Sequence, residues 1–278
     1  MRQMTNRKPV AAGVLYPKTA TELKTKISSL LAENPATAVR DPKTIVVPQG
    51  SYDQVGSLYA KAYNCIRGKK YDVVVILAYS NSEFFNYFSI FSGEEYSSPL
   101  GSVKVDVLLR DELADEDDDI YVSEKGHASE DTFIELQIPW LQTVLEPGFK
   151  IIPLVMGNQS IELCQELDKA LSEVLTQRNI LVVACSDLVF EGKTTPKSVE
   201  KYNDEFLDEL QTKTMEKFFV RKWRDNFKAG SFGSFYVGKQ VAKNLGMKEM
   251  TVFEKKSVKE IRSGSESTVC YYAMAFSR

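Results

Sequence analysis

Apolar runs of strand length alternate with segments of helical periodicity along most of the chain. The runs are rich in Val, Ile and Leu, and several are continuously apolar, as is typical of strands covered on both faces. They predict strands at Thr44–Pro48, Val73–Ala78, Val103–Leu109, Lys150–Met156, Ile180–Ala184 and Val269–Phe276. The intervening segments predict helices at Thr21–Ala32, Gln54–Ile66, Phe133–Leu145, Ile161–Leu175, Val199–Trp223 and Tyr236–Leu245. This alternation indicates an α/β sandwich around one sheet that is at least partly parallel.

No internal repeat, low-complexity linker or break in composition divides the 278 residues. The sequence therefore predicts a single domain over residues 1–278, and leaves open whether roughly the first seven are disordered. The segment Asp111–Asp131 has the composition of a loop, with the acidic run DEDDD at Asp115–Asp119. A calcium loop needs carboxylates that alternate around a turn-forming Gly, so we interpret this segment as a solvated surface excursion.

Composition and charge exclude several classes of partner. The formal net charge is −3, which gives no global reason to expect binding to nucleic acid or to an anionic membrane. The N-terminal segment lacks the apolar core of a signal peptide, and no apolar run has the length of a membrane span. We therefore expect a cytoplasmic protein with neither nucleic-acid nor membrane partners.

Cysteine and histidine usage limits the candidate chemistry. Cys65, Cys164, Cys185 and Cys270 form no CxxC pair, which favours reduced, buried thiols, with the first two on the core-facing sides of helices. The single histidine, His127, lies in a polar segment where we expect it to be solvent-exposed. Because most metal and acid–base sites use histidine, its scarcity argues against such sites.

Two motifs are better explained by packing than by ligand binding. GSFYVGKQ, Gly233–Gln240, has the spacing of a phosphate-binding loop but ends in Gln where Ser or Thr would hold magnesium, so we interpret it as a helix N-terminus. In KFFVRKWRDNFK, Lys217–Lys228, the aromatic residues fall at helical spacing, which favours packing against the sheet over a nucleic-acid or membrane surface.

Polar residues follow three of the predicted strands. Gln49 lies in the loop after the first, Asn81 follows the second, and Cys185 and Asp187 follow the fifth. The carboxyl ends of strands in open α/β sheets form ligand crevices, so we expect these residues at one edge. Cys185 has no histidine nearby in sequence to act as its base, which favours buried packing over nucleophilic catalysis.

Several motifs, in order along the chain, resemble those of the Memo family, which includes AmmeMemoRadiSam system protein B. Together they extend from about Lys8 to Phe276. They are KPVAAGVLYP (Lys8–Pro17), PQGSYDQVG (Pro48–Gly56), VVVILAYSN (Val73–Asn81), YSSPLGSVKVD (Tyr96–Asp106), DTFIELQIPWLQ (Asp131–Gln142), IIPLVMG, VVACSDLVFEG and VCYYAMAF.

The resemblance implies a three-layer α/β/α fold shared with the LigB-type extradiol dioxygenases, which hold non-haem iron with two histidines and a carboxylate. In this chain the histidines of the family motifs are replaced. The first falls on Gln49, the strand-end histidine on Asn81, the histidine of E-H-S on Thr132 and that of S-D-x-S-H on Phe190. The family's cysteine near the last helix falls on Phe232.

These replacements predict a degenerate metal site. Amide oxygens are weak neutral ligands for iron, copper or zinc, and a phenyl ring offers no lone pair, so we expect none of these metals as a cofactor. The resemblance places Tyr52, Glu135, Cys185 and Asp187 in the same cleft as the replaced positions. His127 lies one position from a further histidine of some family members.

Three functional hypotheses follow. The first is a non-catalytic protein that binds a small polar ligand or a peptide through the ancestral cleft. The second is a residual enzyme, either a metal-dependent oxidoreductase or a hydrolase in which Asp187 and Glu135 act with a water. The third is a structural subunit whose protein partner comes from the radical-SAM gene context that the family resemblance implies. One scaffold hosts many functions, so the fold does not choose among them.

Overall fold

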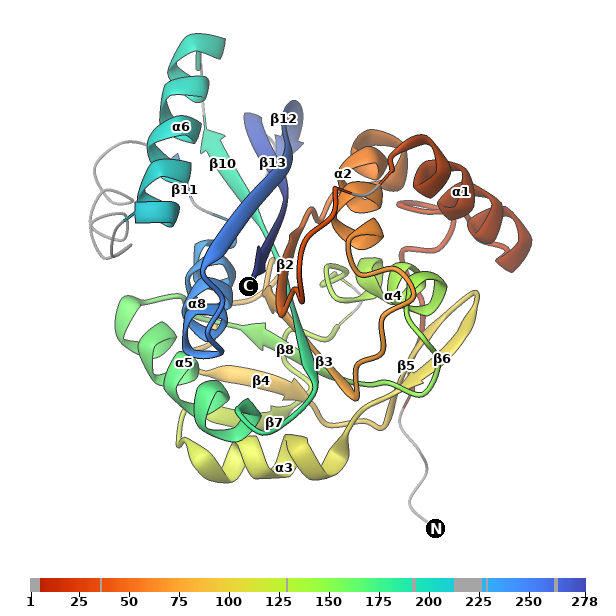
Figure 1. Cartoon of the computed structure of the whole chain (residues 1–278), viewed down its shortest axis with the longest axis vertical. Helices are drawn as coiled ribbons and strands as arrows, with labels where there is room; N and C mark the ends of the chain where they lie inside the picture. The colour runs from red at the N-terminus through yellow and green to blue at the C-terminus, as the bar shows by residue number, and fades with distance from the viewer. Residues whose placement is uncertain are drawn as a thin grey trace.

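A large mixed sheet runs through the middle of the molecule, and helices cover both of its faces (Figure 1). The structure, a computed structural model, describes residues 6–35, 37–128, 130–191, 194–212, 227–228, 230–262 and 265–278. The strands are β1 (Asn6–Arg7), β2 (Thr44–Val47), β3 (Val73–Tyr79), β4 (Phe88–Phe91), β5 (Glu95–Ser98), β6 (Gly101–Lys104), β7 (Ile120–Ser123), β8 (Lys150–Met156), β9 (Ile180–Cys185), β10 (Asp187–Glu191), β11 (Phe227–Lys228), β12 (Glu249–Arg262) and β13 (Ser265–Ser277).

The centre of the large sheet is parallel. Strands β2, β9, β3 and β8 lie side by side in that order, with Val47 opposite Cys185 and Tyr79 opposite Met156. Antiparallel strands flank this centre, because β13 pairs with β2 and β4 pairs with β8. The carboxyl ends of the four central strands therefore meet at one edge of the sheet.

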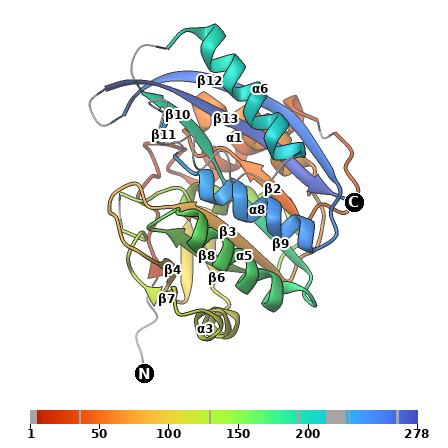
Figure 2. The ribbon, with the colours of Figure 1, turned by 90° about the vertical axis from the view of Figure 1, so that its left-hand side faces the viewer.

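Helices form the two outer layers of an α/β/α sandwich, as predicted. One apolar cluster packs α1, α2 and α4 on one face, and a second packs α3, α5, α6 and α8 on the other. Figure 2 shows α5 and α8 side by side across the second face and α6 over the hairpin of β12 and β13. The helices are α1 (Ala20–Glu33), α2 (Tyr52–Asn64), α3 (Val107–Glu116), the short 3₁₀ helix η1 (Glu135–Gln137), α4 (Ile138–Val144), α5 (Ile161–Leu175), α6 (Pro196–Thr212) and α8 (Phe232–Asn244).

Local sequence signals explain where the regular elements begin. The Thr19 hydroxyl accepts the Glu22 N–H at the start of α1, and the Ser160 hydroxyl accepts the Leu163 N–H at the start of α5. Such caps satisfy amide groups that have no partner within the helix. In β3 all residues except the last are buried, which accounts for its continuous apolar run.

Two sequence-based predictions are wrong in the region between β4 and β8. The run Val103–Leu109 is not one strand, because the Asp106 carboxylate accepts the Leu109 N–H and starts α3 within it. The segment Asp111–Asp131 is not all loop, because it contains the end of α3 and the strand β7, which pairs with β4. The apolar run thus covers the end of β6 and the start of α3. Charged residues of the acidic segment lie on the exposed side of α3.

The other predicted strands and helices are present, with shifted ends. The strands β1, β4, β5, β7, β10, β11 and β12 were not predicted, and β1, β5 and β6 form a separate three-stranded sheet where one sheet was expected. Gly233–Gln240 lies inside α8, as its interpretation as a helix start requires. Residues 213–226 are outside the described residues, which leaves most of Lys217–Lys228 and the end of Val199–Trp223 untested; Phe227–Lys228 pairs with β10.

All four cysteines are free and buried. Cys164 lies on the buried side of α5, and Cys65 directly follows the last residue of α2. Among the helices that the structure describes, none is long and apolar enough to cross a membrane.

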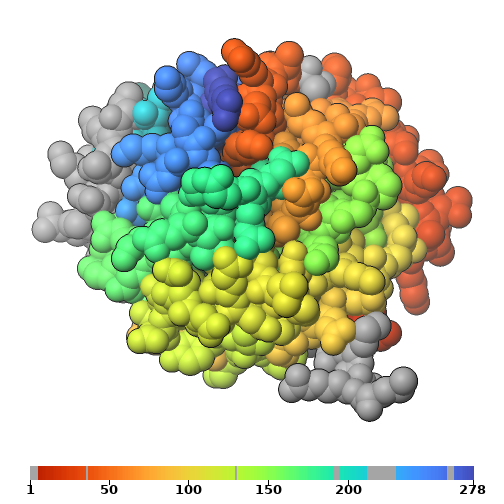
Figure 3. Space-filling view, turned by 60° about the horizontal axis from the view of Figure 1, so that its bottom comes forward, coloured from red at the N-terminus to blue at the C-terminus, as the bar shows by residue number. Residues whose placement is uncertain are grey.

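The amino ends of the parallel strands form the face opposite to the carboxyl-end edge. Figure 3 shows this face, where the segments that precede β3 (orange), β8 (light green) and β9 (teal) lie side by side. The Asn179 side chain donates to the Lys70 carbonyl, and the Asp72 N–H donates to the Asn179 carbonyl, at 2.9 and 2.8 Å. These hydrogen bonds join the segment before β9 to the segment before β3.

A buried carboxylate holds the N-terminal segment against the core. Glu135 is 1% exposed, and its oxygens accept the N–H groups of Val10 (3.0 Å) and Ala11 (2.8 Å) and the Tyr16 hydroxyl (2.6 Å). The Arg7 guanidinium forms an ion pair with it at 3.3 Å. Four donors on one segment thus converge on a single side chain, which fixes the path of the chain before α1.

We expect Glu135→Gln to lower the free energy of unfolding by about 3 kcal/mol. The amide N–H₂ of Gln would face N–H and O–H donors of the N-terminal segment, and the charge of Arg7 would lose its carboxylate partner in the interior. Urea denaturation of both proteins measures this. Glu146→Gln, at an exposed carboxylate, is the matched control and should change the stability little. Equal stability of Glu135→Gln and the unmodified protein would contradict the role of Glu135.

Candidate functional site

Polar residues gather where β2 and β9 end. Gln49 lies two residues after β2, and Ser186 and Asp187 directly follow the last residue of β9. The Ser231 hydroxyl, at the residue before α8, lies between them: it accepts the Asp187 N–H at 2.6 Å and the Gln49 Nε2–H at 3.3 Å. Ser231 also lies 3.2 Å from the Asp187 Oδ1 atom, and its carbonyl accepts the Ser186 hydroxyl at 3.3 Å. We call Gln49, Ser186, Asp187 and Ser231 the Ser231 cluster.

The Ser231 cluster is closed to solvent. Gln49 is 3% exposed, and the other three residues are fully buried. The backbone at Gly230 covers the cluster so closely that an added Cβ would lie 2.2 Å from Asp187 Oδ1 and 2.9 Å from the Tyr79 hydroxyl. Only glycine therefore fits at this position without displacing the carboxylate.

The side-chain oxygen of Gln49 has no hydrogen-bond partner among the described residues. This Oε1 atom is buried, while Nε2 of the same amide donates to Ser231. Turning the amide over would exchange the two atoms and leave the nitrogen unpaired instead. An unpaired buried polar atom costs about 1–3 kcal/mol, so this position is not optimised for stability alone.

Asn81 and Thr132 lie at the end of β3, around a second carboxylate. Asp131 accepts the Asn81 N–H at 2.6 Å and the Ser80 hydroxyl at 3.3 Å, and it also accepts the Ser82 hydroxyl. The Asn81 side chain is exposed and Thr132 is half-buried. We call Ser80, Asn81, Ser82, Asp131 and Thr132 the Asp131 rim. It contains the accessible polar groups at this end of β3.

Tyr52 and Cys185 belong to the apolar core beside the Ser231 cluster. The Tyr52 hydroxyl donates to the Leu136 carbonyl at 2.6 Å, and its ring lies 5.4 Å from that of Trp140. The Cys185 thiol is fully buried and lies 3.8 Å from the Phe133 carbonyl. Burial raises the pKa of this thiol, which keeps it protonated at neutral pH and unreactive as a nucleophile.

The two phenylalanines lie in the second apolar cluster, under α6. The Phe190 ring contacts that of Tyr202, with 5.8 Å between centroids, and the Phe232 ring lies 6.3 Å from that of Phe206. Phe232 directly follows Ser231, but Phe190 lies three residues along β10 from Asp187, opposite Thr268. The structure brings Gln49 and Asp187 together and places Phe190 apart from them.

His127 is buried, contrary to the expectation that it is solvent-exposed. It is 3% exposed; its Nδ1 lies 2.6 Å from the Tyr96 hydroxyl and its Nε2 lies 3.3 Å from the Ser89 carbonyl. A carbonyl only accepts, so Nε2 donates to it and Nδ1 accepts from Tyr96. Burial, together with the charge of Arg7, lowers the pKa of His127 to about 3. Both ring nitrogens are engaged in holding together the core around β4.

The four residues that the motif resemblance aligns with histidines do not fit a transition metal. Gln49 and Asn81 offer amides, Thr132 a hydroxyl and Phe190 a ring, whereas iron, copper and zinc prefer imidazole, thiolate or carboxylate groups that converge on one point. Among the described residues, no group of three or more His, Cys, Asp or Glu side chains is arranged to hold a metal ion.

Comparison with known proteins agrees with the order of the motifs. The family described as Memo-like protein matches residues 7–275. The chain belongs to the Memo family. It is 28% identical to a MEMO1 family protein of Nitrosopumilus maritimus over 97% of this chain and 99% of the relative. It is 29% identical to one of Saccharolobus solfataricus, with the same coverage, and 26% identical to one of Aquifex aeolicus over 98% of this chain and all of the relative.

Several residues of these two groups and their surroundings were missed from the sequence, among them Ser231, Gly230, Tyr79 and Asp131. Asp131 had a signal, because it opens the motif DTFIE and precedes a candidate position. Ser231 precedes a predicted helix, which suggests a cap, but nothing in the sequence relates it to Gln49, 182 positions away. Contacts of that separation depend on the topology of the sheet.

The buried His127 predicts an acid-sensitive core. Its pKa is about 3 when folded and about 6.5 when exposed, so the unfolded chain takes up the proton first as the pH falls. Its stabilising contribution is complete above pH 6.5 and is lost between pH 6.5 and 3, at a slope of up to about 1.4 kcal/mol per pH unit. We expect His127→Gln to remove this part of the slope, as measured by urea denaturation between pH 7 and about 5.5, where few carboxyl groups are protonated. Identical pH profiles for the two proteins would contradict the neutral, buried histidine.

Proposed function

We propose that this Memo-family protein is non-catalytic and has a degenerate metal site, and that it acts by binding a small polar ligand or a peptide segment of a protein partner at the ancestral cleft. The observation that carries the proposal is the Ser231 cluster. Gln49, at the family's first histidine position, donates to a hydroxyl of its own chain. In this proposal, hydrogen bonds from Gln49 and Asp187 to the Ser231 hydroxyl take the place of metal ligands that converge on one ion.

The Asp131 rim supports the binding part of the proposal. Its exposed Asn81 and half-buried Thr132 present neutral donors and acceptors, and Asp131 holds the loop after β3 in place. Rigid, neutral polar groups favour a ligand that is itself polar and uncharged.

The residual-enzyme alternative has less support. Both oxygens of Glu135 accept hydrogen bonds from the N-terminal segment, which leaves Asp187 without the second carboxylate of the proposed pair. The Cys185 thiol is protonated and buried, and both nitrogens of His127 are engaged. We also propose a cytoplasmic location, since four free, buried thiols suit a reducing compartment.

Metal analysis tests the proposal. Protein purified without chelator or added metal should contain far less than one equivalent of iron, copper or zinc, and should not cleave catechol-type substrates under oxygen. Restoring histidine at Gln49, Asn81 and Thr132 together should raise the zinc affinity by orders of magnitude, whereas each single substitution should raise it little. Thermal unfolding of each variant controls for misfolding. A transition metal that the unmodified protein retains through dialysis against a weak chelator would overturn the non-catalytic assignment.

Fragment binding tests the second half of the proposal. Small neutral amides and polyols soaked into crystals should occupy the Asp131 rim, because its accessible groups are neutral donors and acceptors. The isosteric variant Thr132→Val should lose these fragments, and Thr143→Val, at a hydroxyl that donates to the Pro139 carbonyl on α4, is the control that should retain them. Fragments that gather elsewhere and leave the rim empty would count against a ligand site there.

A further inference from the structure

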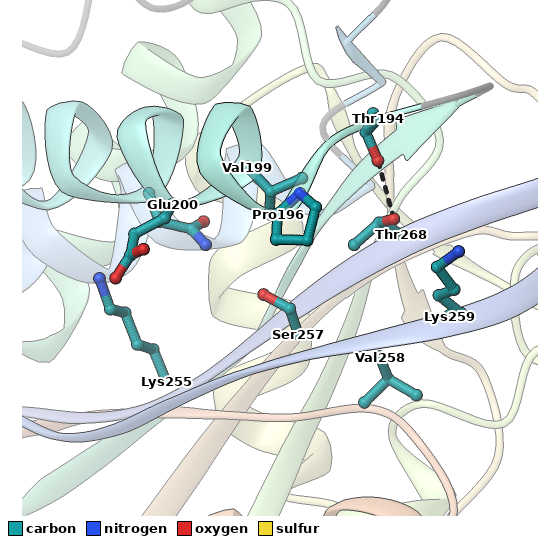
Figure 4. Close-up of a pocket in the computed structure, with 10 residues that line it drawn as sticks. Thr194, Pro196, Val199, Glu200, Lys255, Ser257, Val258, Lys259 and Thr268 are labelled. Atoms are coloured by element: carbon teal, nitrogen blue, oxygen red, sulfur yellow. Dashed lines mark hydrogen bonds between the residues drawn. The ribbon is translucent and has the colours of Figure 1, made fainter.

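A cavity of about 380 Å³ opens between the first turns of α6 and the hairpin of β12 and β13 (Figure 4). Small-molecule sites in proteins have volumes of about 300–1,000 Å³, so this space can hold a compact organic molecule. None of its lining residues belongs to the Ser231 cluster or the Asp131 rim. They are Thr194, Pro196, Val199, Glu200, Asn203, Lys255, Ser257, Val258, Lys259 and Thr268.

The floor of the cavity has polar groups that are weakly satisfied. Asn203 is 3% exposed; its Oδ1 accepts the Tyr272 hydroxyl, and within the described part of the chain its Nδ2 donates only to the Cys270 sulfur, at 3.3 Å. The Ser257 hydroxyl lies 3.1 Å from the same sulfur. Sulfur is a weak acceptor and the amide nitrogen carries two hydrogens, so a buried donor remains for a ligand.

One end of the cavity combines hydroxyls with a cation. The Thr194 and Thr268 hydroxyls lie 2.9 Å apart, so one donates to the other and keeps further capacity. Lys259 lies on the same side of β12 as Ser257, two residues away, and points toward this end in Figure 4. Its ammonium pairs with Glu266 at 3.2 Å, but both side chains are more than 60% exposed. Such pairs are worth little, which leaves Lys259 able to turn to a bound anion.

The rest of the cavity sets the shape and polarity of the ligand. Pro196 and the buried Val199 form an apolar wall on α6. Glu200 and Lys255 lie together at the other end in Figure 4, away from the Thr194–Thr268 pair. Glu200 lines the cavity and would repel an anion at its own end, whereas Glu266 is paired with Lys259 and does not line the cavity, so the negative group of a ligand belongs at the threonine end.

We propose that this cavity binds a small organic oxyanion, a molecule with one phosphate or carboxylate group on a compact apolar body. The oxyanion accepts from Lys259, Thr194 and Thr268, and the apolar body lies against Pro196 and Val199. The proposal stands on a different part of the molecule from the Ser231 cluster and does not depend on the function proposed for it.

Isothermal titration with phenyl phosphate, benzoate and phenol tests this. Phenyl phosphate or benzoate should bind saturably, and the tighter of the two identifies the oxyanion; phenol, which has the ring without the charge, should bind at least about tenfold more weakly. Lys259→Met and the isosteric Thr268→Val should each weaken the anion by about fivefold or more. Lys256→Met is the matched control, since it removes the same charge three residues earlier on β12, where the ammonium donates to the Gln54 carbonyl and does not line the cavity. It should change the affinity less than about twofold.

Three outcomes would overturn the proposal. They are the absence of saturable binding by either anion, equal binding of phenol, and equal losses in Lys256→Met and Lys259→Met. Thermal unfolding of each variant separates lost binding from lost folding. If Thr268→Val fails to fold, the comparison of the two lysine variants still decides, because both lysines are exposed and lie on an edge strand.

Discussion

The buried Ser231 hydroxyl determines how the polar groups at the carboxyl-end edge of the sheet are satisfied. Parallel strands deliver polar groups from β2 and β9 to one enclosed point, and buried polar groups need partners. A metal ion with histidine ligands is one way to satisfy such a point. In this chain Ser231 does so instead: its oxygen contacts the Gln49 amide, the Asp187 backbone and the Asp187 carboxylate. The close approach of Gly230 then keeps solvent out.

The Memo fold is maintained here by interactions that do not involve that point. Glu135 ties the N-terminal segment to η1 through an ion pair with Arg7 and three hydrogen bonds. His127, neutral and buried, links Tyr96 to the backbone of β4. Glu and His side chains in a sequence often suggest catalysis. Here Glu135 and His127 instead hold parts of the fold together. The framework of the fold therefore does not depend on the polar residues at the carboxyl-end edge.

The sequence predicted the central strands well, because β3, β8 and β9 are buried on both faces and read as continuous apolar runs. It failed where one apolar run spans two elements, as at Asp106, and where a strand carries alternating charges, as in β12. It indicated that Gln49 and Asp187 lie at one sheet edge, since both follow parallel strands. The position of Phe190 could not be predicted, because it depends on the direction of β10 after the turn at Ser186.

Anomalous diffraction is the most direct test of the claim that protein hydrogen bonds have replaced the metal at this edge. Crystals grown with excess ferrous iron, copper or zinc would be measured at the absorption edge of each metal. We predict no anomalous peak near Gln49 and Asp187, with density that keeps Ser231 between them. A peak at about 2.0–2.3 Å from the Gln49 and Asp187 oxygens, with Ser231 displaced, would contradict it.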